Sequence, residues 1–256
     1  MSLIVISVGT SLLSNNIQEI ETTESVISWL DECNRLESKK KAGVLGDIKD
    51  ARFNWGESRE LLSVEPESLV KRHAPLRDFF RSFFRKYLDE ATVAENIRHR
   101  SARERDALSA EISSLFLYYY APLHGPEPLR LRSDLGGDEA GAHAAGASDA
   151  PKDTVVLLAT ETADAVLCAV MVREMIRRLP LFSNHCHCDV IDVIPGLDHY
   201  NPSSFCQNSE SNGSGLNNLN QYFYKISQDS NKRVLIRTGG YKEFSSYLML
   251  MALNYR

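Results

Sequence analysis

The sequence lacks a long apolar segment, and its cysteines do not suit a set of disulfide bonds. No apolar run reaches the roughly 18 residues of a membrane-spanning helix, and the N-terminal segment MSLIVISVG has none of the basic residues that open a secretory signal peptide. The five cysteines are an odd number at scattered positions, which argues against a secreted disulfide scaffold. We therefore expect no membrane association and a cytoplasmic, reducing location.

Positive charge is also scarce. The chain has 29 lysines and arginines against 34 acidic residues, a net charge of −5, which argues against a long duplex such as DNA as the partner. A short anionic ligand needs no net positive charge, because backbone N–H groups at helix starts bind phosphate. The first apolar run is not followed by G-x-G-x-x-G, and the sequence has no Walker phosphate loop. An ordinary dinucleotide- or nucleotide-binding enzyme is therefore disfavoured.

Apolar runs that end in a turn and continue as a helical pattern recur along the chain. Residues 3–8 are mostly apolar and β-branched, as in a central strand buried on both faces. Similar strands are predicted at 154–160, 188–194 and 233–237, with helices at 162–178, 216–226 and over the C-terminal residues. Strand–turn–helix units in series predict one α/β domain over residues 1–256. Its fold is expected to be Rossmann-like and doubly wound, with a mainly parallel sheet and helices on both faces.

A helical insertion is predicted after the first strand–helix unit, over about 57–122. Its clearest helix is 75–90, whose aromatic and aliphatic residues recur at i, i+3, i+4 and i+7, and a second is expected at 101–120. Lysines and glycine at 39–43 indicate a loop, and residues 44–74 give no clear pattern. Residues 133–153 are rich in Gly, Ala, Ser and Asp and are expected to form a flexible loop.

Three polar turns follow predicted strands, at Gly9–Asn16, Thr160–Asp164 and Thr238–Lys242. Ligands of doubly wound folds bind at this end of the strands. Hydroxyl groups and backbone N–H groups at a helix start also suit phosphate. Each turn taken alone fits ordinary helix capping equally well. The first and last turns offer these candidate ligand-binding residues: Gly9, Thr10, Ser11, Asn15, Asn16, Thr238, Gly239, Gly240 and Lys242.

Several segments together resemble one family. They are SVGTSLLSNN at 7–16, SAEISSL at 109–115, LLATETADAVLCA at 157–169, VIPGLDHYNPSSF at 193–205, GLNNL at 215–219 and LIRTGGYKEFSSYLMLMAL at 235–253. This combination resembles the CARF domain, the CRISPR-associated Rossmann-like domain of type III CRISPR systems. The resemblance implies a homodimer that binds cyclic oligoadenylate, often cyclic tetra-adenylate, across its two-fold axis. The matching positions are Thr10, Ser11, Asn15 or Asn16, Thr160, Thr162, Gly239, Gly240 and Lys242.

Two functions are compatible with this resemblance. The first is a standalone ring nuclease, which binds cyclic oligoadenylate and cleaves it to switch off the antiviral signal. The second is a non-catalytic sensor module of an effector whose nuclease domain is absent from the chain. Related effectors continue into a HEPN ribonuclease domain with an R-x4–6-H motif. Arg178 and His185 have that spacing but lie between a predicted helix and a strand, so we interpret the match as coincidence and favour the ring nuclease.

Ring cleavage needs no metal and no cofactor, because the ribose 2′-hydroxyl beside each phosphate is the nucleophile. Similar ring nucleases use positions that match Ser11 and Lys242 for cleavage. The resemblance therefore implies that Ser11 orients the hydroxyl or a phosphate oxygen and that Lys242 neutralises developing charge. The products would be linear adenylates that end in 2′,3′-cyclic phosphate.

Two other polar features have a simpler explanation beside the functional one. Strand alternation at 185–188 would place Cys186 and Cys188 on one face and the histidines on the other, so no metal site is predicted there. Asp198 lies near a strand end, where ligand contact and ordinary loop polarity explain it equally well.

Overall fold

The computed structural model describes residues 2–14, 20–65, 69, 73–93, 109–120, 151–198, 203–206, 214–228, 232–237, 248 and 250. The first half contains β1 (Ser2–Ser7), α1 (Ser11–Ser14), α2 (Thr23–Asn34), α3 (Ser38–Lys49), β2 (Arg52–Trp55), β3 (Leu61–Glu65), α5 (Ala74–Tyr87) and α7 (Ala110–Tyr120). The second half contains β4 (Asp153–Thr160), α9 (Ala163–Arg178), α10 (Pro180–Ser183), β5 (Cys186–Ile194), α11 (Ser203–Cys206), α12 (Gly215–Ser227) and β6 (Lys232–Arg237).

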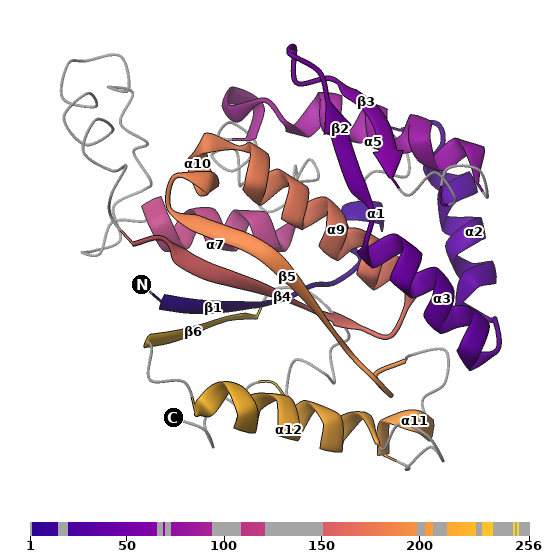
Figure 1. Cartoon of the computed structure of the whole chain (residues 1–256), viewed down its shortest axis with the longest axis vertical. Helices are drawn as coiled ribbons and strands as arrows, with labels where there is room; N and C mark the ends of the chain where they lie inside the picture. The colour runs from indigo at the N-terminus through magenta and orange to yellow at the C-terminus, as the bar shows by residue number, and fades with distance from the viewer. Residues whose placement is uncertain are drawn as a thin grey trace.

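A parallel four-stranded sheet in the order β5-β4-β1-β6 forms the centre of the molecule (Figure 1). The chain enters at β1, adds β4 and then β5 on one side, and returns to place β6 on the other side of β1. Ile6 of β1 is in register with Leu157 of β4 and with Ile236 of β6. The predicted Rossmann-like α/β fold with a mainly parallel sheet is confirmed.

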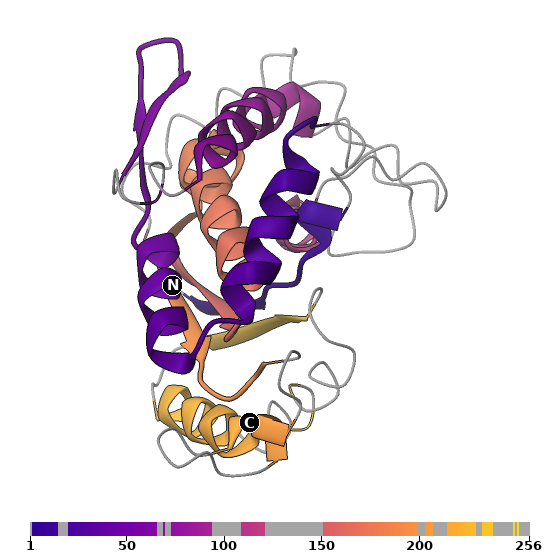
Figure 2. The same cartoon turned by 90° about the vertical axis from the view of Figure 1, so that its right-hand side faces the viewer.

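Side chains along the central strands alternate between two apolar cores. Ile4 and Ile6 of β1 lie in the larger core, whose other members come largely from α2, α5, α7 and α9. Val5 of β1 and Leu158 of β4 lie in the smaller core with Phe223 of α12. Figures 1 and 2 show α9 and α12 on opposite faces of the sheet. The predicted helices on both faces are therefore present.

The region after the first strand–helix unit differs from its prediction in two places. Residues 39–43, predicted as a loop, belong to α3. The lysines there are good helix formers, and burial of Leu45 and Ile48 against the core stabilises the helix despite its two glycines. The expected helical insertion over 57–122 includes a strand, because β3 pairs with β2 as an antiparallel hairpin that projects beyond α3 (Figure 2).

Other parts of the predicted insertion are present as helices. The helix predicted at 75–90 is α5, with its six buried residues on one face. The helix predicted at 101–120 is described from Ala110 as α7, while 101–108 lie outside the described residues. The loop predicted at 133–153 also lies outside them, except at its end, where Asp153 begins β4. Within the described part of the chain, no helix is both long and apolar enough to cross a membrane.

We expect Gly215→Ala to lower the free energy of unfolding by about 1–3 kcal/mol. A Cβ at this position would lie 2.5 Å from the carbonyl oxygen of Gly196. That carbonyl has little freedom to move, because Gly196 has a φ of 80° and donates its N–H to Glu161. Urea unfolding measures the change. The control is Gly43→Ala in α3, whose Cβ would meet no atom within 4 Å and which should add about 0.5–1 kcal/mol. Equal stability of Gly215→Ala and the wild type would contradict the packing described.

Candidate ligand-binding site

The chain leaves β1, β4 and β5 at one edge of the sheet, and backbone hydrogen bonds join the three exits. Val8 N–H donates to the Leu158 carbonyl at 2.9 Å. Glu161 N–H donates to the Leu197 carbonyl at 2.8 Å, and the Glu161 carboxylate accepts the Gly196 N–H at 2.7 Å. These bonds hold the turn after β4 against the turn after β5. The carboxyl edge is thus a continuous surface built from segments far apart in sequence.

β6 ends at the same edge, since Arg237 is in register with Ser7 of β1. The strand order reverses direction between these two strands, and ligands of doubly wound folds bind at such a switch point. The residues that follow β6 and were predicted to bind ligand lie outside the described residues: Thr238, Gly239, Gly240 and Lys242. Asn15 and Asn16 of the first turn lie outside them as well.

The first predicted turn connects β1 to the short helix α1. Leu12 and Leu13 are buried and anchor the helix, while Thr10 is exposed and Ser11 is half-buried. The Thr10 carbonyl accepts the N–H groups of Leu13 and Ser14 at 3.0 and 3.1 Å, so it begins the helical turn. Thr10 and Ser11 therefore remain accessible at the surface of this turn.

A buried carboxylate that sequence reasoning missed lies beneath this turn. Glu111 of α7 is 1% exposed. Its Oε1 accepts the Gly9 N–H at 2.8 Å, and its Oε2 lies 3.4 Å from the Ser11 hydroxyl, which donates to it. The signal in the sequence was an acidic residue within the apolar helical segment SAEISSL. Gly9 itself is buried, and its N–H is already satisfied by protein.

Burial disfavours the charged form of the Glu111 carboxyl group. Loss of hydration raises the pKa of its carboxyl above the ordinary 4.5, while hydrogen bonds from the Gly9 N–H, from its own backbone and from the Ser109 and Ser11 side chains lower it by less. Ser109 also supports the helix, because its hydroxyl accepts the Ile112 N–H at 3.0 Å in the first turn of α7. The carboxyl group is therefore held at a fixed place beneath the turn.

We expect wild type to lose stability relative to Glu111→Gln as pH rises. Because the folded-state pKa of Glu111 is raised, the folded protein holds this proton over a range where the unfolded chain has released it. The stability this provides is fully present below the unfolded pKa and is lost as pH rises through the folded one. Urea unfolding of both proteins between pH 4.5 and 8.5 measures the difference. A difference that stays constant, or that changes in favour of wild type, would contradict this assignment.

The second predicted turn is largely used for helix capping. Thr162 is fully buried, and its hydroxyl accepts the Ala165 N–H at 3.4 Å as the N-cap of α9. The Ala163 N–H donates to Asn34 Oδ1 at 2.7 Å, and the Asn34 side-chain nitrogen Nδ2 donates to Asp164 Oδ1 at 3.1 Å. Protein groups thus satisfy two of the free N–H groups that could have bound phosphate. Thr160, half-buried, is the more accessible of the two predicted threonines.

Asp198 forms a largely buried ion pair with Lys41 of α3. The Lys41 Nζ lies 2.5 Å from Asp198 Oδ2, and the two side chains are 8% and 12% exposed. The pair joins α3 to the turn after β5 over 157 positions of sequence. The sequence left two explanations open for Asp198, ligand contact and loop polarity. The structure gives a third, because Lys41 of α3 neutralises the Asp198 charge.

The His185–Cys188 segment follows the predicted alternation. Cys186 and Cys188 are buried and His187 is exposed. His185 stacks on Tyr119 with ring centroids 5.0 Å apart, and its Nε2 lies 3.0 Å from the Tyr120 hydroxyl. Among the described residues, no three His, Cys, Asp or Glu side chains lie together in a position to hold a metal ion.

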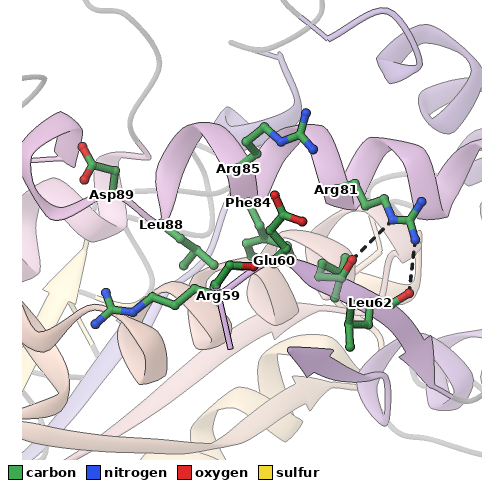
Figure 3. Close-up of a pocket in the computed structure, with 10 residues that line it drawn as sticks. Arg59, Glu60, Leu62, Arg81, Phe84, Arg85, Leu88 and Asp89 are labelled. Atoms are coloured by element: carbon green, nitrogen blue, oxygen red, sulfur yellow. Dashed lines mark hydrogen bonds between the residues drawn. The ribbon is translucent and has the colours of Figure 1, made fainter. Parts of the chain in front are cut away.

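A separate pocket of about 530 Å³ lies between the β2–β3 hairpin and α5 (Figure 3). Leu62, Phe84 and Leu88 contribute its apolar wall. The Arg81 side chain donates to the carbonyls of Leu61 and Leu62 at 3.3 and 3.2 Å, so this arginine fastens the hairpin to the helix. The pocket contains none of the residues predicted to bind ligand, and its mixture of arginines and acids favours no single ligand charge.

The C-terminal part of the chain is similar to a known protein family. Residues 142–256 match the model of a family described as CRISPR-associated protein (Cas_APE2256). The matched range contains β4, β5 and β6, and with them two of the three turns predicted at strand ends. No curated protein matches the chain. The family match supports an association with CRISPR systems and does not by itself name a ligand or a reaction.

Proposed function

We propose that the protein is a ring nuclease that binds cyclic tetra-adenylate, a four-membered cyclic oligoadenylate, as a homodimer. It cleaves the ring without a metal ion and so ends type III CRISPR signalling. The observation that carries this proposal is the position of the first turn. Thr10 and Ser11 lie at the carboxyl end of β1, beside the point where the strand order reverses.

Two further observations support the same ligand class. The C-terminal residues match a CRISPR-associated family, and the sequence motifs at the strand ends resemble those of CARF domains. A symmetric ring of four nucleotides suits a two-fold interface, because each chain then contacts one half of the ring. The modest net charge of −5 is compatible with a small, enclosed anionic ligand.

The proposed reaction is an internal transesterification. The ribose 2′-oxygen attacks the adjacent phosphorus, a bond forms between them, and the bond from phosphorus to the next 5′-oxygen breaks. The 2′-hydroxyl proton leaves and the 5′-oxygen gains one, so the product is a linear adenylate with a 2′,3′-cyclic phosphate. Ser11 orients the attacking hydroxyl, and Lys242 neutralises charge on the phosphorane. No histidine is needed for this geometry, and the expected turnover is slow.

Calorimetric titration with cyclic tetra-adenylate tests the binding half of the proposal. We expect one ring to bind per two chains, and we expect linear tetra-adenylate to bind at least tenfold more weakly because its ends are not held together. A protein that binds neither molecule would contradict the proposal. Binding without cleavage would instead identify the sensor module, the other function compatible with the sequence.

A further inference from the structure

The hydrogen-bond direction at Ser11 is set by Glu111. Across the 3.4 Å contact the Ser11 hydroxyl is the donor and Glu111 Oε2 is the acceptor. Ionisation of Glu111 enforces this direction, because a carboxylate only accepts hydrogen bonds. A serine hydroxyl has one proton and two acceptor lone pairs. With its proton directed to Glu111, the Ser11 oxygen can only accept a hydrogen bond from a ligand.

The structure holds Glu111 in this role. Its other carboxylate oxygen is fixed by the Gly9 N–H at 2.8 Å, and the side chain is 1% exposed. Ile112 and Leu115 of the same helix are fully buried in the larger core. The carboxylate is therefore held beneath the turn. The 3.4 Å contact is long for a hydroxyl donor, and such contacts commonly shorten when a ligand draws the groups together.

This direction decides which part of a nucleotide Ser11 can bind. Phosphate oxygens accept hydrogen bonds, so they do not match a serine oxygen that also accepts. The buried carboxylate next to the turn also repels a second anion at short range. A hydroxyl or amino group of the ligand can donate to Ser11. In a 3′–5′-linked adenylate ring the donors are the ribose 2′-hydroxyl and the adenine 6-amino group.

We infer that Ser11 and Glu111 form a ribose-recognition pair, in which the Ser11 oxygen accepts a hydrogen bond from the 2′-hydroxyl of the ligand. This inference rests on the proposed function and makes it more specific. Glu111 acts as a positioning residue, since it touches Ser11 and not the ligand. The same hydrogen bond orients the hydroxyl that attacks phosphorus, so recognition of ribose and alignment for cleavage would share one contact.

The test compares binding of cyclic tetra-adenylate with binding of its all-2′-deoxy analogue, which keeps the adenine amino groups. Binding is measured at pH 8.5, because high pH favours the ionised form of Glu111, and wild type should prefer the ribose ring by about 10- to 100-fold. Ser11→Ala should lose most of this preference. Glu111→Gln should lose a similar share, because its amide N–H group would donate to Ser11 and turn the serine proton toward the ligand.

A control variant separates this role from helix stability. Ser14→Ala removes a hydroxyl from the same short helix as Ser11 and leaves the contacts of Glu111 with Gly9 and Ser11 in place, because the Ser14 hydroxyl donates to the carbonyls of Thr10 and Ser11. This variant should therefore keep the wild-type preference. The inference is overturned if wild type binds the ribose ring but Ser11→Ala keeps the full preference, or if folded Glu111→Gln keeps it. If wild type binds neither ring, the proposed function fails, and the inference fails with it. Circular dichroism establishes whether each variant is folded. If Glu111→Gln does not fold, Ser11→Ala, at a half-buried position, still tests whether the Ser11 hydroxyl recognises ribose.

Discussion

Ser11→Ala is expected to slow cleavage of cyclic tetra-adenylate by about 100-fold, the usual loss when one positioned hydrogen-bonding group is removed from a reacting centre. Ser11 is half-buried at the start of α1, and its hydroxyl bonds to Glu111. Without that hydroxyl, the ribose 2′-oxygen loses the contact that would align it with phosphorus. The effect should fall on the rate of the chemical step, with the fold unchanged.

Single-turnover assays in EDTA measure this rate with enzyme in excess over ring. The matched control is Ser14→Ala, at the other end of the same short helix. The Ser14 hydroxyl is exposed and donates to the carbonyls of Thr10 and Ser11 instead of to Glu111. This variant should cleave within about threefold of wild type. A Ser11→Ala protein that cleaves at the wild-type rate would remove Ser11 from the mechanism.

Phe84→Ala is expected to lower the free energy of unfolding by about 3–5 kcal/mol, the range for truncating a buried aromatic residue. Phe84 of α5 is 1% exposed. Its ring lies 5.1 Å from that of Phe53 and 5.2 Å from that of Trp55, both in edge-to-face geometry. Because these partners belong to β2, the variant opens a cavity at the seam between the hairpin and the helix.

Urea unfolding at fixed pH measures the change, and Tyr224→Ala provides the comparison. Tyr224 of α12 is 58% exposed, so its truncation should change stability by no more than about 0.5 kcal/mol. A loss below 1 kcal/mol for Phe84→Ala would mean that the hairpin does not pack on α5 as described.

The parallel sheet and its main helices could be predicted because their signals are local. The apolar run at 154–160 and the apolar helix after it appear as β4 and α9 with boundaries shifted by one residue at most. The aromatic periodicity at 75–90 likewise gave α5. In each case the hydrophobic pattern of the sequence follows directly from burial, either of one face of a helix or of a whole segment, so the pattern predicts the element.

The hairpin and α3 were missed for a physical reason. β2 and β3 are only four and five residues long, too short for alternation to stand out from a mixed background. α3 is stabilised mainly by tertiary contacts on one side, and its lysines and glycines resemble a loop. Tertiary packing determines the secondary structure of both segments, and a short window of sequence does not contain the residues against which they pack.

The site was predicted only in part, because its supporting contacts are long-range. Glu111 reaches Gly9 across 102 positions, Asn34 reaches Ala163 across 129, and Lys41 reaches Asp198 across 157. No spacing rule relates such pairs. Once they are known, they show that the Ala163 N–H is already bound by Asn34 and that the buried Glu111 lies where Ser11 can donate to it.

The most direct test of the central claim is product analysis. Purified protein is incubated with cyclic tetra-adenylate in excess EDTA, and the products are separated by chromatography and identified by mass. We predict linear adenylates that end in 2′,3′-cyclic phosphate. A ring that remains intact after prolonged incubation with excess protein would contradict the claim that this protein is a metal-independent ring nuclease.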